Sequence, residues 1–396
     1  MMIAYDLLLG IAALPFIYYS LAIYGTLRFF SRQRPSAPQE PVFAPPVSCF
    51  KPVRGLDTDA YENFASFCRQ DYPEYEILFC VDDNDPAFPV IQKVLHDHPD
   101  VKIRILNGPD HFAVNDKVAR LDRLSKEASY DVWVLSDSDV RVTPDYLRTV
   151  VAPLQNSKTG GVTCFYVAIK EDTFTEKLQE MGMMCDFFPG ILVAWLLDGV
   201  KFGFGQTIVT TRARIEGFGG FRAIENRPAD DLLVCRFVTE QGFEVELLPY
   251  TVHTTPDFGS MKELLYKRTR WMTVLRHTRP WGHLGLIFTF GLPWSLLVLG
   301  IDALDPSLAI GLSYVGVYFV VRVIMTWLVG ARGLKQQGLW KRMLLIPIWD
   351  ATAFAIWLVS FARRTIRWRG VDYTLKGGLL TLANAERGNA SPPANA

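Results

Sequence analysis

The chain has 396 residues and 41 Lys plus Arg against 41 Asp plus Glu, so its formal net charge is zero. This length gives room for one large domain or two ordinary domains. Without a basic excess to neutralise a phosphate backbone, nucleic-acid binding is not expected.

The first apolar run covers residues 7–27 and contains no charge. It is long enough to cross a bilayer, which takes about 20 apolar residues. A signal peptide would carry positive charge before the run, whereas here Asp6 precedes it and Arg28, Arg32 and Arg34 follow it. We therefore expect an uncleaved transmembrane anchor over residues 1–30, with the following segment on the cytoplasmic side.

A Pro-rich, polar linker is expected over residues 31–46, "SRQRPSAPQEPVFAPP". From Val47 onward, short apolar runs alternate with helical patterns, which predicts a doubly wound, mostly parallel α/β sheet in a cytoplasmic domain over residues 47–280. The six cysteines are scattered without the spacing of a metal site, so we expect reduced and mostly buried thiols.

Two predicted strands end in acidic residues. "VWVLSDSDV" places Asp137 and Asp139 after a buried strand, and "ILFCVDDND" ends in Asp82 and Asp83. Ligands bind at the carboxyl ends of parallel strands, so these acids would gather at one crevice. A divalent cation bridging Asp137 or Asp139 to a nucleotide diphosphate would offset the carboxylate repulsion, although either strand end alone could equally be a helix N-cap.

The second half of the domain carries three further features. The Gly203-x-Gly205 pair lacks the third glycine and the preceding strand of a dinucleotide fingerprint, so a loop is expected there. Asp230 and Asp231 open a helical run, either as helix-dipole partners or as the place for a general base. The basic segment 264–280 is either a positive-inside flank or a cover for an anionic ligand.

Three apolar runs follow, at about 284–301, 307–330 and 344–362, within a membrane region expected over residues 281–363. A full third span would put the arginines of the tail, residues 364–396, outside the cell, against the positive-inside rule. We therefore predict that 344–362 is a re-entrant or interfacial helix and that the tail is cytoplasmic.

Two apolar segments raise separate questions. Asp350 is costly at bilayer depth unless it is paired, and Arg322 is the candidate partner. The stretch 183–197 is expected at the membrane surface, or else as a buried core helix interrupted at Pro189.

Taken in order, several motifs resemble the ceramide glucosyltransferase family, which has hopanoid-associated glycosyltransferases as close relatives. They are "FKPVRGLD", "FASFCRQDYPEYEILFCVDDNDPA", "NDKV", "LSDSDVRVTPDYL", "GGVTCFY", "ADDLLV", "KRTRW" and "IRWRGVDYTLKGG". The resemblance implies a membrane-bound inverting enzyme with a GT-A type nucleotide-sugar domain, an N-terminal anchor and C-terminal transmembrane or re-entrant helices. One departure is Lys267, where the family has Gln or Arg three residues before Arg-Trp. It keeps a cation but lacks the arginine fork.

The resemblance also implies a donor site. Asp83, with Asp82 beside it, would contact the uridine of a UDP-sugar. Pro52 and Lys117 would line the nucleotide pocket, and the pair Asp137 and Asp139 would bind Mn²⁺ or Mg²⁺ and through it the diphosphate.

The remaining implied roles concern the acceptor. Asp231 would be the catalytic base, and Asp230 would raise the pKa of that base by like-charge proximity. Arg270 and Trp271 would close over the diphosphate and the acceptor.

The implied reaction is transfer of a hexose, with glucose preferred, from a UDP-sugar to the hydroxyl of ceramide. Transfer to another lipid, such as a hopanoid or diacylglycerol, is the alternative. A processive polysaccharide synthase is a third enzymatic alternative. Such an enzyme would be expected to have a Gln-x-x-Arg-Trp element and more membrane spans, and neither is found in this sequence. The non-enzymatic alternative is a membrane scaffold or transporter that binds nucleotide. The expected location is the inner membrane of a bacterium or the cytosolic face of the Golgi or endoplasmic reticulum.

Overall fold

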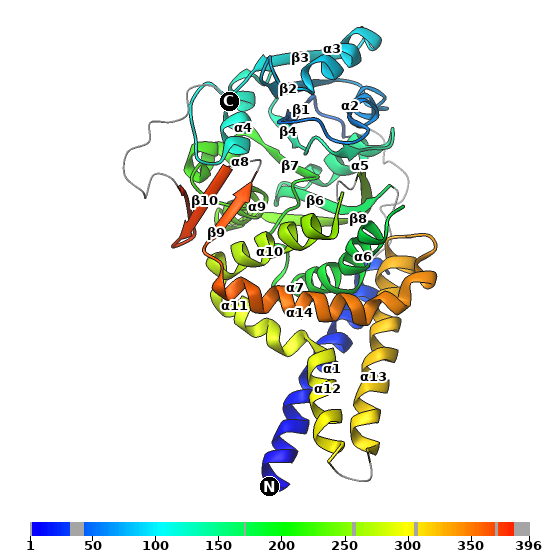
Figure 1. The fold of residues 1–396 in the computed structure, drawn as a ribbon. Coiled ribbons are helices and arrows are strands. Elements are labelled where there is room, and N and C mark those ends of the chain that lie inside the picture. Colours follow the sequence, from blue (N-terminus) through cyan, green and yellow to red (C-terminus); the bar gives the residue numbers. More distant parts are fainter. Residues whose placement is uncertain are drawn as a thin grey trace.

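The computed structural model describes residues 2–31, 43–169, 172–255, 259–304, 308–368 and 371–383. Most of the expected linker, the predicted flanking residues Arg32 and Arg34, and Arg369 of the tail lie outside these ranges. The described chain has three layers, namely an α/β domain, a layer of helices beneath it and a helix bundle that projects away (Figure 1).

The α/β domain is built on an eight-stranded sheet of order β3-β2-β1-β4-β7-β6-β8-β5. Strands β3, β2, β1 and β4 run parallel, β6 and β8 pair in parallel, and β7 and β5 are antiparallel to their neighbours. The strands are β1 Val47–Pro52, β2 Tyr75–Val81, β3 Lys102–Asn107, β4 Val132–Leu135, β5 Val140–Arg141, β6 Thr159–Ala168, β7 Ile208–Thr211 and β8 Glu244–Thr254. The predicted mostly parallel α/β sheet is confirmed.

Helices cover both faces of this sheet, which is why the central strands β1, β2 and β4 are buried along nearly their whole length. Alternate residues of one strand enter different cores: Trp133 packs with Phe50 in one, and Val134 packs with Cys49 in the other. The domain helices are α2 Ala60–Cys68, α3 Phe88–Asp97, α4 Asp116–Glu127, α5 Tyr146–Val151, α8 Arg212–Gly217 and α9 Asp230–Glu240. All six cysteines are free and buried, as predicted.

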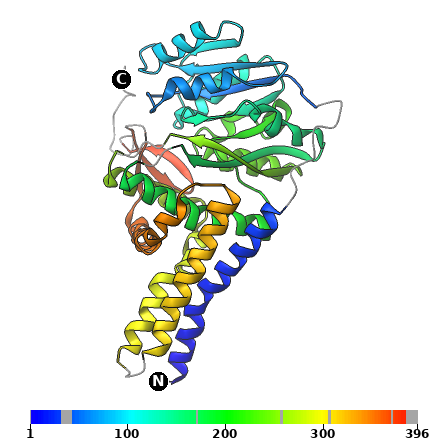
Figure 2. The ribbon, with the colours of Figure 1, turned by 90° about the vertical axis from the view of Figure 1, so that its right-hand side faces the viewer.

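The projecting bundle contains α1 Met2–Phe30, α12 Gly291–Asp302 and α13 Ala309–Thr326 (Figures 1 and 2). At about 1.5 Å per residue, α1 is roughly 43 Å long, enough to cross a bilayer. By length and composition alone, four helices could cross a membrane: Ile3–Phe30, Phe174–Asp198, Ala309–Gly333 and Leu339–Ala362. A bent pair, Pro280–Thr289 with Gly291–Asp302, turns by 49° and could be a fifth.

A layer of helices separates the sheet from the bundle, and we call it the platform. It contains α6 Phe174–Gly182, the π-helix η2 Met183–Phe187, α7 Phe188–Asp198, α10 Met261–Thr278 and α14 Ile346–Ala362. Helix α14 lies across the bundle axis in Figure 1 and is seen end-on in Figure 2. The segment predicted to be re-entrant or interfacial therefore does not run alongside the bundle helices.

Asp350 in α14, which was predicted to need a partner at bilayer depth, has one. Arg322 of α13 donates from Nε to Asp350 Oδ2 at 2.9 Å, and Tyr318 donates its hydroxyl to the same oxygen at 2.7 Å. Arg322 also donates to the carbonyl of Cys185 in η2. The predicted Arg322–Asp350 pair is confirmed, and it joins the bundle to the platform.

The last described residues form a small antiparallel sheet rather than an open tail. Its strands are β9 Thr365–Trp368, β10 Val371–Lys376 and β11 Leu379–Leu382, in the order β11-β10-β9. We call it the C-terminal sheet. It lies beside α10, on the same side of α14 as the α/β domain (Figure 1).

Candidate functional site

The predicted acidic strand ends lie at one edge of the sheet. Strands β2, β1 and β4 are adjacent and parallel, with Phe50 of β1 aligned with Leu78 of β2 and Leu135 of β4. Their carboxyl ends therefore open at the same place, the usual site of ligand binding in such sheets. Pro52 closes β1 at this edge.

A lysine stands between the acids of two different motifs. Lys117 Nζ lies 2.7 Å from Asp137 Oδ1 and 3.0 Å from Asp230 Oδ2. Burial opposes its charge, but Asp137, Asp230 and Asp231 together hold its pKa above the ordinary value. The carboxylate repulsion at the end of β4 is thus partly offset by the protein's own cation.

The loop at Gly205 joins this cluster to Asp231. The Gly205 N–H donates to Asp231 Oδ2 at 3.2 Å, and its carbonyl accepts from the Asp137 N–H at 3.0 Å. A Cβ on Gly205 would lie 2.6 Å from Asp137 Oδ2 and 3.0 Å from Lys117 Nζ, so a larger residue would displace these two side chains. The expected loop is present, but its part in the site was not predicted.

Asp137 and Asp139 are both half-buried, but one carboxylate oxygen of Asp139 is fully buried. Among the described residues its Oδ1 has no hydrogen-bond partner, and burial, followed by Asp137 and Asp57, raises its pKa to about 7. Asp57 in turn accepts a hydrogen bond from the Ser138 hydroxyl. A buried carboxylate oxygen without a partner, beside a second carboxylate, is a donor set suited to a hard divalent cation.

A second lysine lies under the same turn. Lys51 is fully buried and donates from Nζ to Ser136 Oγ at 3.0 Å and to the Asp137 carbonyl at 2.9 Å. Burial lowers its pKa to about 7. Sequence reasoning missed both Lys51 and Asp57, although Lys51 directly precedes Pro52 in the quoted "FKPVRGLD".

Asp231 sits in the first turn of α9, after Ala229 in the left-handed region at φ 58°. Burial, followed by the neighbouring Asp230, raises the pKa of Asp231 to about 6. At neutral pH such a carboxylate is still ionised and is a stronger base than an ordinary aspartate. It could therefore accept a proton from a hydroxyl.

The proposed uridine contacts lie at the neighbouring strand end. Asp82 accepts from Arg120 Nη2 at 2.6 Å, whereas the more exposed Asp83 accepts from Asn107 Nδ2 at 2.5 Å. Strands β2 and β4 flank β1, so these acids stand about two strand spacings, roughly 10 Å, from the Asp137 turn.

The Arg-Trp motif lies on α10, in the platform. The Arg270 guanidinium is 5.7 Å from the ring centroid of Trp368, and the 39% exposed Trp271 lies 6.4 Å from the ring of Phe187 in η2. Lys267 lies one turn earlier on the same helix. The motif thus contacts the C-terminal sheet on one side and the aromatic residues of the platform on the other.

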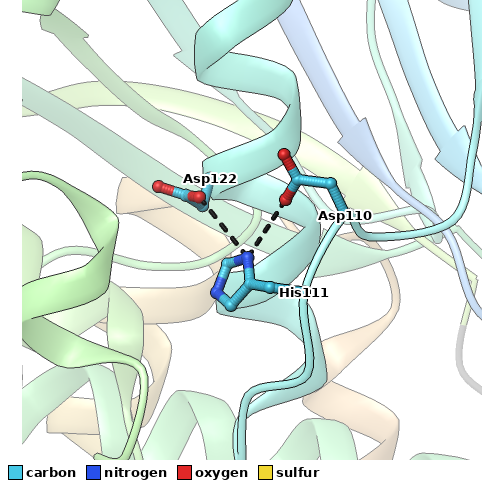
Figure 3. A group of neighbouring side chains, drawn as sticks. All are labelled: Asp110, His111 and Asp122. Atoms are coloured by element: carbon cyan, nitrogen blue, oxygen red, sulfur yellow. Dashed lines mark hydrogen bonds and ion pairs between the residues drawn. The ribbon is translucent and has the colours of Figure 1, made fainter.

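A further group of potential metal ligands consists of Asp110, His111 and Asp122 (Figure 3). His111 Nδ1 lies 3.0 Å from Asp110 and 3.6 Å from Asp122, and Nε2 lies 3.2 Å from Glu225. Lys126 Nζ is 2.8 Å from both aspartates and already compensates them. We therefore describe this group as an ion network that ties the β3–α4 loop to Glu225.

Comparisons with known proteins agree with this geometry. The chain is 23% identical to ceramide glucosyltransferase 1 of Caenorhabditis elegans over 350 residues, which are 84% of this chain and 72% of that protein. It is 32% identical to the ceramide glucosyltransferase of Gibberella zeae over 184 residues, 42% of this chain and only 34% of that longer protein.

Among solved structures, the mannosyltransferase PcManGT of Pyrobaculum calidifontis, in complex with GDP-Man and Mn²⁺, has a TM-score of 0.57 at 17% identity. The match covers 88% of this chain and 98% of that one, and it shows a shared GT-A fold. The sequence profile of glycosyl transferase family 21 matches residues 7–380. The chain therefore belongs to glycosyl transferase family 21, the family of the ceramide glucosyltransferases, and is a glycosyltransferase.

Proposed function

We propose that this glycosyltransferase moves a hexose, glucose in the first instance, from a UDP-sugar to the primary hydroxyl of ceramide, with inversion at the anomeric carbon. The observation that carries the proposal is Asp231, a half-buried carboxylate with a pKa of about 6 that accepts a hydrogen bond from the Gly205 N–H beside the Asp137–Lys117 cluster. The ceramide acceptor is suggested by the names of the relatives.

On the donor side, Asp83 and Asp82 bind the uridine at the end of β2, and Pro52 and Lys117 line its pocket. Asp137 and Asp139 would hold Mn²⁺ or Mg²⁺, and the ion would supply positive charge to the diphosphate and so make UDP a better leaving group. Arg270 adds a guanidinium to the phosphate oxygens.

On the acceptor side, Asp231 takes the proton of the lipid hydroxyl. The hydroxyl oxygen then forms a bond to the anomeric carbon as the bond from that carbon to the diphosphate oxygen breaks, and UDP leaves. The Gly205 N–H fixes one oxygen of Asp231, and Asp230 keeps the pKa of the base high. Attack from the face opposite UDP gives inversion.

The acceptor enters through the platform, between the sheet and the bundle. Phe187 lies next to Trp271, and its ring centroid is 5.7 Å from that of Phe204, which precedes Gly205. This aromatic group connects η2 to the loop that holds Asp231. We propose that α1, α13 and the bent pair Pro280–Thr289 with α12 span the membrane and that the catalytic domain is cytoplasmic.

The test is transfer from radiolabelled UDP-glucose to ceramide by detergent-solubilised protein, with Asp231→Asn as the inactive control. Parallel reactions replace the donor with UDP-galactose, UDP-glucuronate or UDP-N-acetylglucosamine and the acceptor with diacylglycerol or a hopanoid. Mass spectrometry of lipids from expressing cells reports sugar and acceptor together. If labelled product forms only on a hopanoid or on diacylglycerol, that lipid replaces ceramide as the proposed acceptor. The absence of any product would favour a nucleotide-binding scaffold.

A further inference from the structure

The C-terminal sheet packs on segments that carry motif residues. Its buried side chains contact Val114, which precedes the Asn115–Lys117 element, and Val274 on α10, one turn after Arg270. The buried members are Ile366, Tyr373, Leu375 and Leu380. A short sheet of this size has little core of its own, so this contact stabilises it against the catalytic domain.

A backbone hydrogen bond ties the same sheet to the loop before the proposed catalytic base. The Leu380 N–H donates to the Asn226 carbonyl at 2.8 Å. From the other side, Asn115 Nδ2 donates to the Arg227 carbonyl at 3.0 Å. The segment leading to Asp230 is therefore held between the C-terminal sheet and the N-cap of α4.

The sheet also meets the helix of the Arg-Trp motif through side chains. The Arg367 N–H donates to the hydroxyl of Tyr266, and the Trp368 ring lies 5.7 Å from the Arg270 guanidinium. Tyr373, buried in the sheet, has Arg54 and Asp116 as its neighbouring charges. A guanidinium on a flexible side chain loses less entropy on binding phosphate when an aromatic face already restrains it.

We propose that Trp368 is a positioning residue for the donor, which holds Arg270 toward the diphosphate, and that the C-terminal sheet clamps α10 to the α4 N-terminus and to the loop before Asp230. The inference rests on the proposed function, because it takes Arg270 as a diphosphate contact. It assigns to residues 365–368 and 371–382 a part in the transfer site.

The experiment compares Trp368→Ala with Trp340→Ala in the full chain. Trp340 is a matched control, since it is 70% exposed on the platform side and also stands beside a cation, Lys341, at 5.6 Å. Calorimetry gives the Kd for UDP with Mn²⁺, and kinetics give KM for UDP-sugar and lipid separately. Measured well below the thermal midpoint of the variant, Trp368→Ala should raise the UDP Kd and the donor KM about fivefold, the order of one cation–π contact, and leave the lipid KM unchanged.

Two further variants separate positioning from folding. Trp368→Phe keeps an aromatic face and should restore most of the donor affinity. In an Arg270→Ala background, Trp368→Ala should cause no additional loss, because the two residues act as a pair.

The outcomes distinguish the two proposals. If Trp368→Ala keeps the wild-type donor affinity, the inference is wrong and the proposed function still stands. The same holds if the variant weakens donor binding and lipid binding equally and its thermal midpoint falls as well. A wild-type protein that neither binds UDP nor transfers sugar would overturn the proposed function, and with it the donor contact of Arg270.

Discussion

The Lys117 ammonium lies between two carboxylates of the candidate site, Asp137 after β4 and Asp230 at the start of α9. Asp137 and Asp230 come from motifs almost a hundred residues apart, and the lysine bridges their carboxylates at short range. When a metal-bound nucleotide enters, the same ammonium can turn to a phosphate oxygen, because lysine binds as a flexible point charge.

Lys117→Met should therefore destabilise the protein as well as weaken nucleotide binding. We expect a loss of about 1–3 kcal/mol at pH 7, below the range for a fully buried pair because both partners keep some exposure. The loss should shrink at high salt, because ions screen the attraction between these partly exposed charges. Urea unfolding at low and high salt measures it, and an equal loss at both salt concentrations would contradict the charge argument.

Asp137→Ala and Asp139→Ala should each remove metal-dependent transfer while the protein still folds. Asp139 is expected to be the milder change for folding, since its buried Oδ1 has no partner among the described residues and its removal relieves a desolvation cost. Mn²⁺ calorimetry and thermal melts, with and without chelator, measure both effects. Full turnover by either variant in chelator-treated buffer would refute the metal assignment.

The pH dependence of transfer tests Asp231. Its pKa of about 6 is raised by burial and then by Asp230, so kcat/KM should fall about tenfold per pH unit below 6. Asp230→Asn removes a charge that raises this pKa, so the acid limb should move to lower pH.

Asp231→Asn is the matched variant for that profile. It should abolish transfer and leave UDP-sugar affinity nearly intact, because the base acts on the acceptor. Loss of donor affinity equal to the loss of rate would place Asp231 among the binding residues instead.

At the scale of elements, the strands and helices from β1 to α5 follow directly from periodicity, since each apolar run is short and bounded by polar residues. The family resemblance assigned Asp137, Lys117, Asp230 and Asp231 to one site, and the structure places these side chains close together, while their roles stay predictions. Lys51, Gly205 and Trp368 escaped prediction because their roles depend on contacts between distant segments. Strand β7 was likewise hidden inside a glycine-rich stretch.

The platform holds the element that sequence patterns describe least well. Residues 183–197 were expected at the membrane surface or in a core, and they form the π-helix η2 followed by α7, with Pro189 in the first turn of α7. A π-helix leaves a carbonyl free to bond elsewhere, and Arg322 takes that of Cys185. Such a partner lies too far along the chain for local patterning to reveal.

Substitutions in this segment should separate the lipid from the donor. Phe187→Ser should raise the lipid KM much more than the donor KM, because Phe187 packs on Trp271 near the proposed acceptor path. Trp195→Ser should also raise the lipid KM more than the donor KM if α7 guides the lipid. Its ring lies 5.1 Å from that of Phe29 on α1, so thermal melts must accompany the kinetics. Equal changes in both KM values would indicate misfolding.

At the scale of the whole molecule, the transverse α14 decides which side of the membrane the chain ends on. Helices α1, α12 and α13 run along one axis, and α14 crosses it, with Asp350 paired to Arg322 (Figures 1 and 2). Length and hydropathy alone would make α14 another span. The positive-inside rule predicted otherwise, because it weighs the arginines that follow the segment.

Cysteine labelling at two described positions tests this topology. All six native cysteines are buried, so introduced thiols should be the ones that react. Leu304 is 89% exposed at the end of α12, where the bundle lies farthest from the domain, and Lys376 is exposed on β10 beside the domain. In intact cells an impermeant maleimide should modify Leu304→Cys and should reach Lys376→Cys only after permeabilisation. Modification of Lys376→Cys in intact cells would mean that α14 crosses the bilayer and that the C-terminal sheet lies outside, away from a cytoplasmic catalytic domain.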